Sequence, residues 1–260
     1  MELQQIPLEQ ILLFLTILAR VAGCIAAIPI FSTSQAPITA RVGLIFFTAL
    51  LLFPVLAPQI QATSFAPLPF TLFIIAETLL GLLLGLTSRL IFTAVEFGGT
   101  VIGYQMGFAA ANVYDPTGQR QVALLSQFQN VFAILIFLAV DGHHYFFRLA
   151  VHSYELLPPG QLRLGGDAVP YLMQLASHMF TLGVQFSAPV LALLLLSGLI
   201  LGILARVFPQ LNVFMLSFPI NIGLSFIVIA LTLDMVTALL RREFAELPGR
   251  LGQLLQLLAQ

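Results

Sequence analysis

The chain has 260 residues, of which 59% are hydrophobic and only 8% are charged. A soluble domain carries about a quarter charged residues, so this composition argues against an ordinary soluble fold and indicates a bilayer or a packed membrane complex. The formal net charge of −1 argues against nucleic acid as a partner, because no basic field exists to neutralise phosphates. The sequence has no lysine, which excludes lysine-dependent phosphate loops and Schiff-base chemistry.

Apolar stretches follow one another along the chain and are separated by polar turns. They cover about residues 8–30, 40–56, 70–92, 128–140, 180–208 and 213–240. Most approach the roughly 20 residues that a helix needs to cross a bilayer. The fourth stretch stops at Asp141-Gly142, where a second helix is expected to begin and run to about Leu157. Only Pro209-Gln210-Leu211-Asn212 separates the last two stretches, which predicts a helical hairpin.

Prolines interrupt the apolar pattern. Pro29, Pro54, Pro189 and Pro219 lie inside or at the ends of the stretches, where proline removes a backbone hydrogen bond. Kinked helices sheltered by neighbouring subunits fit this pattern better than isolated spans. We therefore predict an all-α, multi-helix integral membrane protein with kinked helical hairpins.

Glycines recur four residues apart, which places them on one helical face and allows helix backbones to approach closely. We interpret this spacing as predicting helix-packing faces, in preference to chance. The sets are Gly81 with Gly85, Gly99 with Gly103 and Gly107, and Gly198 with Gly202.

Four charged residues, Arg20, Glu77, Arg89 and Glu96, fall within or near apolar stretches. A charge at the bilayer centre costs about 2.5–3.5 kcal/mol on insertion scales, so such residues pair or face water. A transporter interpretation would make them a proton relay, whereas the favoured interpretation pairs them with neighbours or places them outside the hydrocarbon.

Asp141, His143, His144 and His152 invite a metal-site interpretation. The two adjacent histidines are expected to point to different helix faces, and no cysteine completes a site. We therefore interpret Asp141 as an N-cap whose carboxylate accepts backbone N–H groups, and predict no metal ligand and no bound cofactor. No nucleophile elbow, zinc-protease motif or phosphate loop occurs, so we predict that the chain is not an enzyme.

Three groups of residues, in their order and spacing, resemble the signatures of one bacterial family. The first is Gly103-Tyr104-Gln105-Met106-Gly107-Phe108-Ala109 with Asp115-Pro116, and the second is Asp141-Gly142-His143 with Ser153. The third comprises Ala188-Pro189, Gly198, Gly202, Arg206, Pro209-Gln210-Leu211-Asn212-Val213-Phe214 and Phe218-Pro219. Together they resemble the FliR family from Arg20 to about Leu240. One departure is Asp141, where asparagine is expected of the family.

The resemblance implies a subunit of the flagellar type III protein export channel in the bacterial inner membrane, at the basal body. Members join FliP-type and FliQ-type subunits in a helical channel for unfolded proteins, with an FlhB-type subunit alongside. The implied organisation is a FliP-like part over 1–182, a FliQ-like hairpin over 183–247 and a C-terminal tail over 248–260. Gly99, Gly103, Gly198, Gly202, Pro209 and Asn212 are the expected packing and partner-interface residues.

The segment from about 106 to 122 matches the family's plug loop. Soft apolar side chains can dewet a constriction and can also repack around cargo, which suits a pore that must block ions yet pass a polypeptide. The expected plug residues are Met106, Gly107, Phe108, Ala109, Ala110, Tyr114, Asp115 and Pro116. Three alternatives remain: an injectisome counterpart, a small-molecule or ion transporter, and a scaffold that leaves the pore to its partners.

Overall fold

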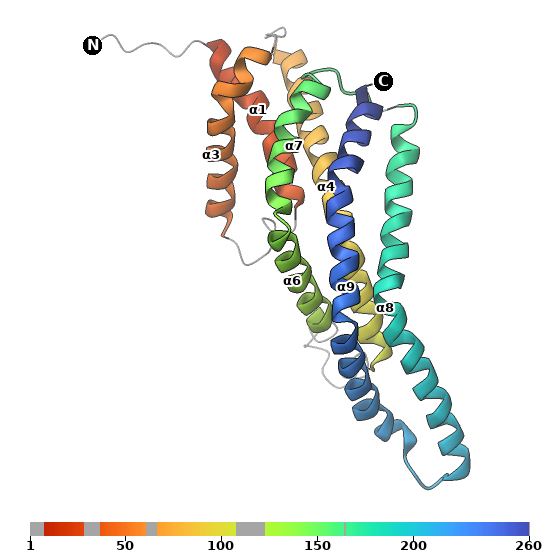
Figure 1. Cartoon of the computed structure of the whole chain (residues 1–260). Coiled ribbons are helices and arrows are strands. Elements are labelled where there is room, and N and C mark those ends of the chain that lie inside the picture. Colours follow the sequence, from red (N-terminus) through yellow and green to blue (C-terminus); the bar gives the residue numbers. More distant parts are fainter. Residues whose placement is uncertain (1–7, 29–36, 61–66, 108–122, 164, 260) are drawn as a thin grey trace. The chain divides into compact units, whose positions relative to one another are not determined.

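The computed structural model describes residues 8–28, 37–60, 67–107, 123–163 and 165–259. Every regular element in these ranges is helical, which confirms the all-α prediction (Figure 1). Five helices are long and apolar enough to cross a membrane, or up to six if a bent helix pair counts as one span. The elements are α1 Leu8–Ala27, α3 Ile38–Leu56, η1 Ala57–Gln59, α4 Pro67–Gln105, α6 Ala123–Ala139, α7 Gly142–Leu156, α8 Ala168–Val207 and α9 Val213–Ala259.

Three helices are longer than the apolar stretches that predicted them. The third apolar stretch ends near Phe92, whereas α4 continues to Gln105. Likewise α8 begins at Ala168, before the apolar stretch does, and α9 continues without a break through the segment expected as a tail. Hydrophobicity marks the part of a helix that suits lipid. The helical backbone hydrogen bonds continue through polar residues until a residue adopts a non-helical conformation.

Prolines inside the helices do not end them. Pro54 lies within α3 and Pro189 within α8, and both helices continue beyond their proline. A proline in a helix interior removes one hydrogen bond and introduces a kink, and neighbouring turns can hold the helix together around it.

The chain divides into two compact units. The first comprises Met1–Leu90, Asp141–Leu175 and Ala245–Gln260, and the second comprises Ile91–Val140 and Ala176–Phe244. Helices α4, α8 and α9 each contribute a segment to both units.

The first unit is built around α1. Ile17, Val21 and Ile25 of α1 form a buried cluster with residues of α3 and with Tyr154 of α7. Where α1 passes α4, a Cβ on Gly23 would lie 2.8 Å from the backbone nitrogen of Leu82. A Cβ on Gly81 would lie 2.9 Å from the backbone nitrogen of Cys24. The two helix backbones therefore pack directly on each other, as the four-residue glycine spacing predicted.

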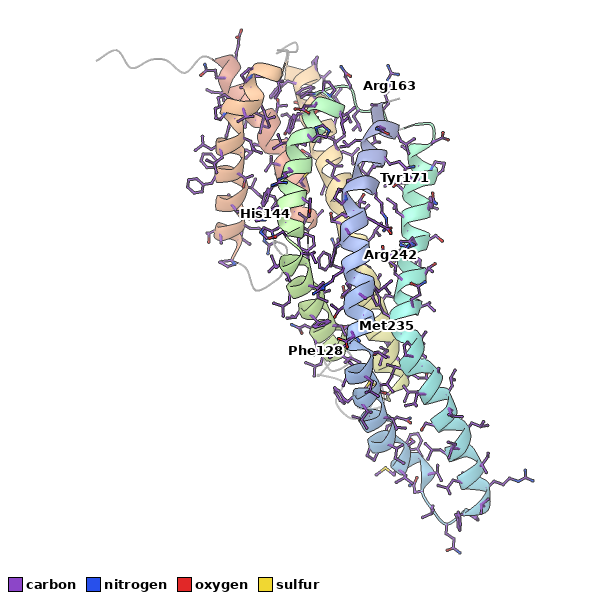
Figure 2. All side chains as sticks on the ribbon, viewed as in Figure 1. Phe128, His144, Arg163, Tyr171, Met235 and Arg242 are labelled. Atoms are coloured by element: carbon purple, nitrogen blue, oxygen red, sulfur yellow. The ribbon has the colours of Figure 1, made fainter. Side chains whose placement is uncertain are left out.

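The second unit has an aromatic centre. The rings of Phe92, Phe137 and Phe244 have centroids 5.0 to 5.6 Å apart. This unit also contains most of the hairpin formed by α8 and α9 (Figure 1). Side chains project outward along the length of this hairpin (Figure 2), and many of them are large and apolar. Within one chain, the hairpin thus leaves apolar surface exposed.

Candidate functional site

Of the expected plug residues, the structure describes only Met106 and Gly107. They directly follow the end of α4 at Gln105. The others lie outside the described residues: Phe108, Ala109, Ala110, Tyr114, Asp115 and Pro116.

Met106 is buried in the second unit. Its side chain is 0% exposed and belongs to a cluster with Ile102, Leu125, Val190 and Leu194. The start of the expected plug segment is therefore anchored in apolar packing between α4, α6 and α8. A polar side chain at this position would lose solvation without gaining a partner.

Gly107 ends α4 by its backbone conformation. Its φ is +94°, a value that side chains other than glycine rarely tolerate. A Cβ at this position would also lie 2.7 Å from the ring of Phe218 on α9. Glycine is thus required here both by the turn and by the close approach of an aromatic ring.

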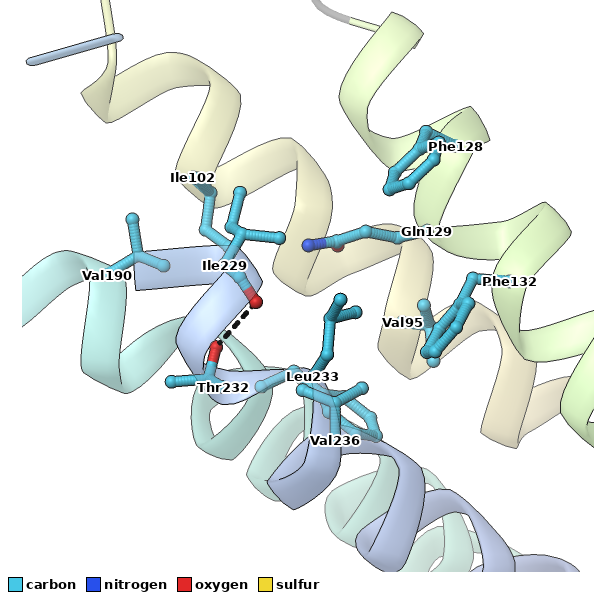
Figure 3. A pocket seen from close by; sticks show the side chains of 11 residues that line it. Val95, Ile102, Phe128, Gln129, Phe132, Val190, Ile229, Thr232, Leu233 and Val236 are labelled. Atoms are coloured by element: carbon cyan, nitrogen blue, oxygen red, sulfur yellow. Dashed lines mark hydrogen bonds between the residues drawn. The ribbon is translucent and has the colours of Figure 1, made fainter. Parts of the chain in front are cut away.

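A small cavity lies within the second unit (Figure 3). Its volume is about 30 Å³, which is room for about one water molecule. The Gln129 side chain reaches into it from α6, and its buried Oε1 has no hydrogen-bond partner. Across the cavity, the Thr232 hydroxyl donates to Ile229 O at 3.2 Å. Gln129 was not singled out from the sequence, although an amide inside the apolar stretch 128–140 is a signal for a buried polar group.

The predicted packing glycines fall into two classes. Gly99 packs within the chain, since a Cβ on it would lie 2.6 Å from the backbone Cα of Ser126 on α6. Gly103, one turn later on α4, is buried. In contrast, a Cβ on Gly198 or Gly202 would meet no atom within 4 Å. These two glycines therefore mark a strip of α8 that no described part of the chain covers.

The turn between α8 and α9 contains two further expected interface residues. The Asn212 Oδ1 accepts a hydrogen bond from the Met215 N–H at 3.2 Å, which makes Asn212 the N-cap of α9. Pro209 is exposed in the same turn. Asn212 thus has a role within the chain, independent of any partner.

Arg20 and Glu77 form a buried ion pair in the first unit. Arg20 is 1% exposed, and its Nε donates to Glu77 Oε2 at 2.7 Å. Its other two nitrogens donate to Ser153 Oγ and to the Leu157 carbonyl oxygen, each at 3.1 Å. The second Glu77 oxygen accepts the Gly160 N–H at 3.1 Å. Every side-chain nitrogen of Arg20 and both carboxylate oxygens of Glu77 therefore make at least one hydrogen bond within the protein.

This network supports the pairing interpretation of the intramembrane charges. The Arg20 guanidinium also lies 4.0 Å from the ring centroid of Tyr154, a cation–π contact. A charge held by this many contacts acts as a fixed connection between α1, α4 and α7. The remaining two of the four charges, Arg89 and Glu96, are exposed on α4.

Asp141 occupies the N-cap position of α7, but the prediction that its carboxylate caps the helix is wrong. Its backbone lies in the left-handed region, with φ 56° and ψ 27°, and its side chain makes no capping hydrogen bond. The expectation that His143 and His144 diverge is also wrong, because their ring centroids are 4.1 Å apart. Side chains in the first turn of a helix have no preceding turn to separate them, so periodicity alone misplaced these rings.

One histidine–glutamate hydrogen bond was missed altogether. His178 Nε2 of α8 lies 3.0 Å from Glu243 Oε2 of α9, and the Glu243 side chain is only 4% exposed. The sequence did carry a signal for it, because Glu243 is an acidic residue next to the buried Phe244 and three residues after the buried Leu240.

Comparison with known proteins identifies relatives across most of the chain. The model of the family described as bacterial export proteins, family 1, matches residues 11–247. The flagellar biosynthetic protein FliR of Bacillus subtilis is 33% identical over 237 residues, which cover 89% of this chain and 90% of that protein. FliR of Pectobacterium carotovorum is 31% identical, with 91% and 90% covered. FliR of Escherichia coli is 29% identical, with 96% and 97% covered.

Proposed function

This chain belongs to the bacterial export proteins, family 1, and on that premise we propose that it is a subunit of the flagellar type III protein export channel. The observation that carries this proposal is the family match over residues 11–247, which spans both compact units. The names of the relatives favour the flagellar assignment over an injectisome counterpart.

In this proposal the chain works as one member of a ring of subunits. The α8–α9 hairpin and α3 expose many large apolar side chains, among them Leu199, Ile203 and Phe214 of the hairpin. Lipid or another helix must cover such side chains. We assign the partners as FliP-type and FliQ-type subunits, with an FlhB-type subunit alongside, and the cargo as unfolded flagellar protein.

The location that follows is the bacterial inner membrane at the flagellar basal body. Five candidate spans with mean hydropathy of 2.0 to 2.5 support insertion in a membrane. Each side-chain nitrogen of Arg20 and each carboxylate oxygen of Glu77 makes a hydrogen bond within the protein. This arrangement supports a structural role for the pair, in preference to a proton relay.

Sealing of the pore is assigned to the segment from about 106 to 122. Its first residue, Met106, is anchored in the apolar cluster of the second unit, and Gly107 turns the chain away from α4. A segment that begins with apolar side chains and is held at that end by such packing is suited to close a constriction by excluding water.

Co-purification tests the proposed function. The tagged chain is expressed with and without FliP-type and FliQ-type partners, solubilised in mild detergent, and examined by native gel and mass spectrometry. We expect one large discrete complex with the partners, and low yield without them, because the uncovered apolar faces then have no protein contact. A well-folded lone monomer with unchanged thermal stability in the presence of partners would refute the shared channel. Association with injectisome subunits alone would refute the flagellar assignment.

A further inference from the structure

Three potential metal-ligating side chains gather at the start of α7. Asp141, His143 and His144 each offer one ligand atom, and these atoms all lie within 4.8 Å of one another. His144 Nδ1 and Asp141 Oδ1 lie 3.3 Å apart. Tetrahedral zinc with bonds of about 2.0–2.1 Å holds its ligand atoms about 3.4 Å apart. Small rotations of these side chains would therefore bring all three ligand atoms to one ion.

The Asp141 carboxylate is not used by the helix that it precedes. An N-cap aspartate normally accepts backbone N–H groups of the first turn, but this one makes no such hydrogen bond. Its left-handed backbone, with φ 56°, turns the side chain away from that role. Asp141 is 71% exposed, so the carboxylate is also free to reorient toward an ion.

The imidazole rings of His143 and His144 lie close enough together for both to bind one metal ion. Their ring centroids are 4.1 Å apart with an interplanar angle of 37°. His143 Nδ1 is buried and has no hydrogen-bond partner among the described residues, whereas His144 is 63% exposed. A buried ring nitrogen without a partner is an unsatisfied polar atom, and metal binding or a bound water would satisfy it.

The position of this cluster at the N-terminus of α7 weakens the binding of a cation. The N-terminal end of α7 carries the positive end of the helix dipole, which disfavours a metal ion near the first turn. Among the three ligands only Asp141 can supply negative charge to offset that effect. The carboxylate should accordingly contribute more to affinity than either imidazole does.

We propose that Asp141, His143 and His144 form a binding site for a divalent transition-metal ion of the zinc, nickel or copper type. Two imidazoles and one carboxylate suit these ions better than magnesium or calcium, which prefer oxygen ligands only. Three protein ligands leave at least one coordination position for water or for a side chain of another subunit. This site is independent of the proposed export function.

Metal binding is tested on the full-length chain in its purified membrane complex, with an affinity tag that lacks histidine. Zinc is titrated by competition with a chromophoric chelator, and copper(II) is examined by electron paramagnetic resonance. We expect one zinc ion for each copy of this chain, and a copper spectrum with coupling to two imidazole nitrogens. Second-shell changes at metal sites commonly cost 10–100-fold in affinity, so loss of a direct ligand should cost at least about tenfold.

The variants are Asp141→Asn, His143→Gln and His144→Gln. Asparagine tolerates the left-handed conformation as aspartate does, so Asp141→Asn removes charge without straining the backbone. The matched control is His152→Gln, because His152 lies in the same helix and pairs with Glu155, at 2.6 Å, outside the proposed site. Weaker binding in all three variants, with Asp141→Asn the weakest and His152→Gln unchanged, supports the site. Wild-type affinity in Asp141→Asn or His144→Gln, or no zinc bound by the wild type, overturns it.

Discussion

Arg20 of α1 and Glu77 of α4 form an ion pair at 2.7 Å, with side chains only 1% and 2% exposed. Fifty-seven positions separate them in the chain, and the pair is completed by the turn after α7. Removing one partner from such a pair leaves an uncompensated buried charge, whereas replacing both leaves apolar packing.

The first prediction concerns this pair. Arg20→Met should destabilise the protein by about 3–5 kcal/mol, because Glu77 is left buried without its counterion. The double variant Arg20→Met with Glu77→Leu should recover much of that loss. The measurement is unfolding in mixed micelles, followed by circular dichroism, as a double-mutant cycle. Equal stability of Arg20→Met and the wild type would contradict a structural role for the pair.

The second prediction concerns the crossing of α1 and α4. A Cβ on Gly81 would collide with the Arg20 carbonyl oxygen and lie 2.9 Å from Cys24 N, and neither backbone atom can rotate away. Gly81→Ala should therefore cost about 1–3 kcal/mol through overpacking.

Gly43 in α3 provides the matched control. A Cβ at this position meets nothing within 4 Å, so Gly43→Ala should stabilise the helix by up to about 1 kcal/mol. Thermal melts of the two variants in the same detergent give the comparison. A shift of the same sign in both would show that helix propensity, and not the close crossing, decides the effect at Gly81.

The third prediction concerns Gly198 and Gly202. Leucine at both positions should not destabilise the isolated chain, since a Cβ at either position meets nothing within 4 Å and leucine has the higher helix propensity. Assembly with FliQ-type partners should fall, together with motility, if a neighbouring hairpin packs on this strip. Native-gel abundance of the complex and swimming assays provide the two measurements.

Ile200 is the control for that experiment. It lies between the two glycines in α8 and is 58% exposed, so Ile200→Leu keeps nearly the same volume at an exposed site. This variant should assemble and swim normally. Assembly that is equally intact in the glycine double variant would mean that no partner occupies the strip.

The fourth prediction concerns the proposed plug. Phe108→Asp, or deletion of residues 109–117, should make cells that express the complete complex leak ions and small solutes, because a charge or a wider gap hydrates an apolar constriction. Secretion should fall less than on loss of the whole protein. Dye uptake and conductance are measured alongside native-gel abundance. Intact assembly without extra leakage in both variants would contradict the plug assignment.

Much of the helical architecture could be predicted from the sequence. Hydropathy located the helices and the α8–α9 hairpin, because lipid-compatible length and apolar composition are local properties. Glycine spacing predicted the close crossing at Gly81, since the lack of a side chain is itself the feature that permits contact. The order of short motifs indicated the family, which the match over residues 11–247 bears out.

Tertiary structure alone decided which groups meet. Nothing in the local sequence of Arg20 indicates that Glu77, Ser153 and the Leu157 carbonyl oxygen will surround it, because those contacts depend on how three helices pack. The same holds for Asp141, whose left-handed backbone redirects a carboxylate that N-cap preferences assign to the helix. Local preferences set where helices begin and what they expose, whereas the geometry of packed backbones determines which polar groups become partners.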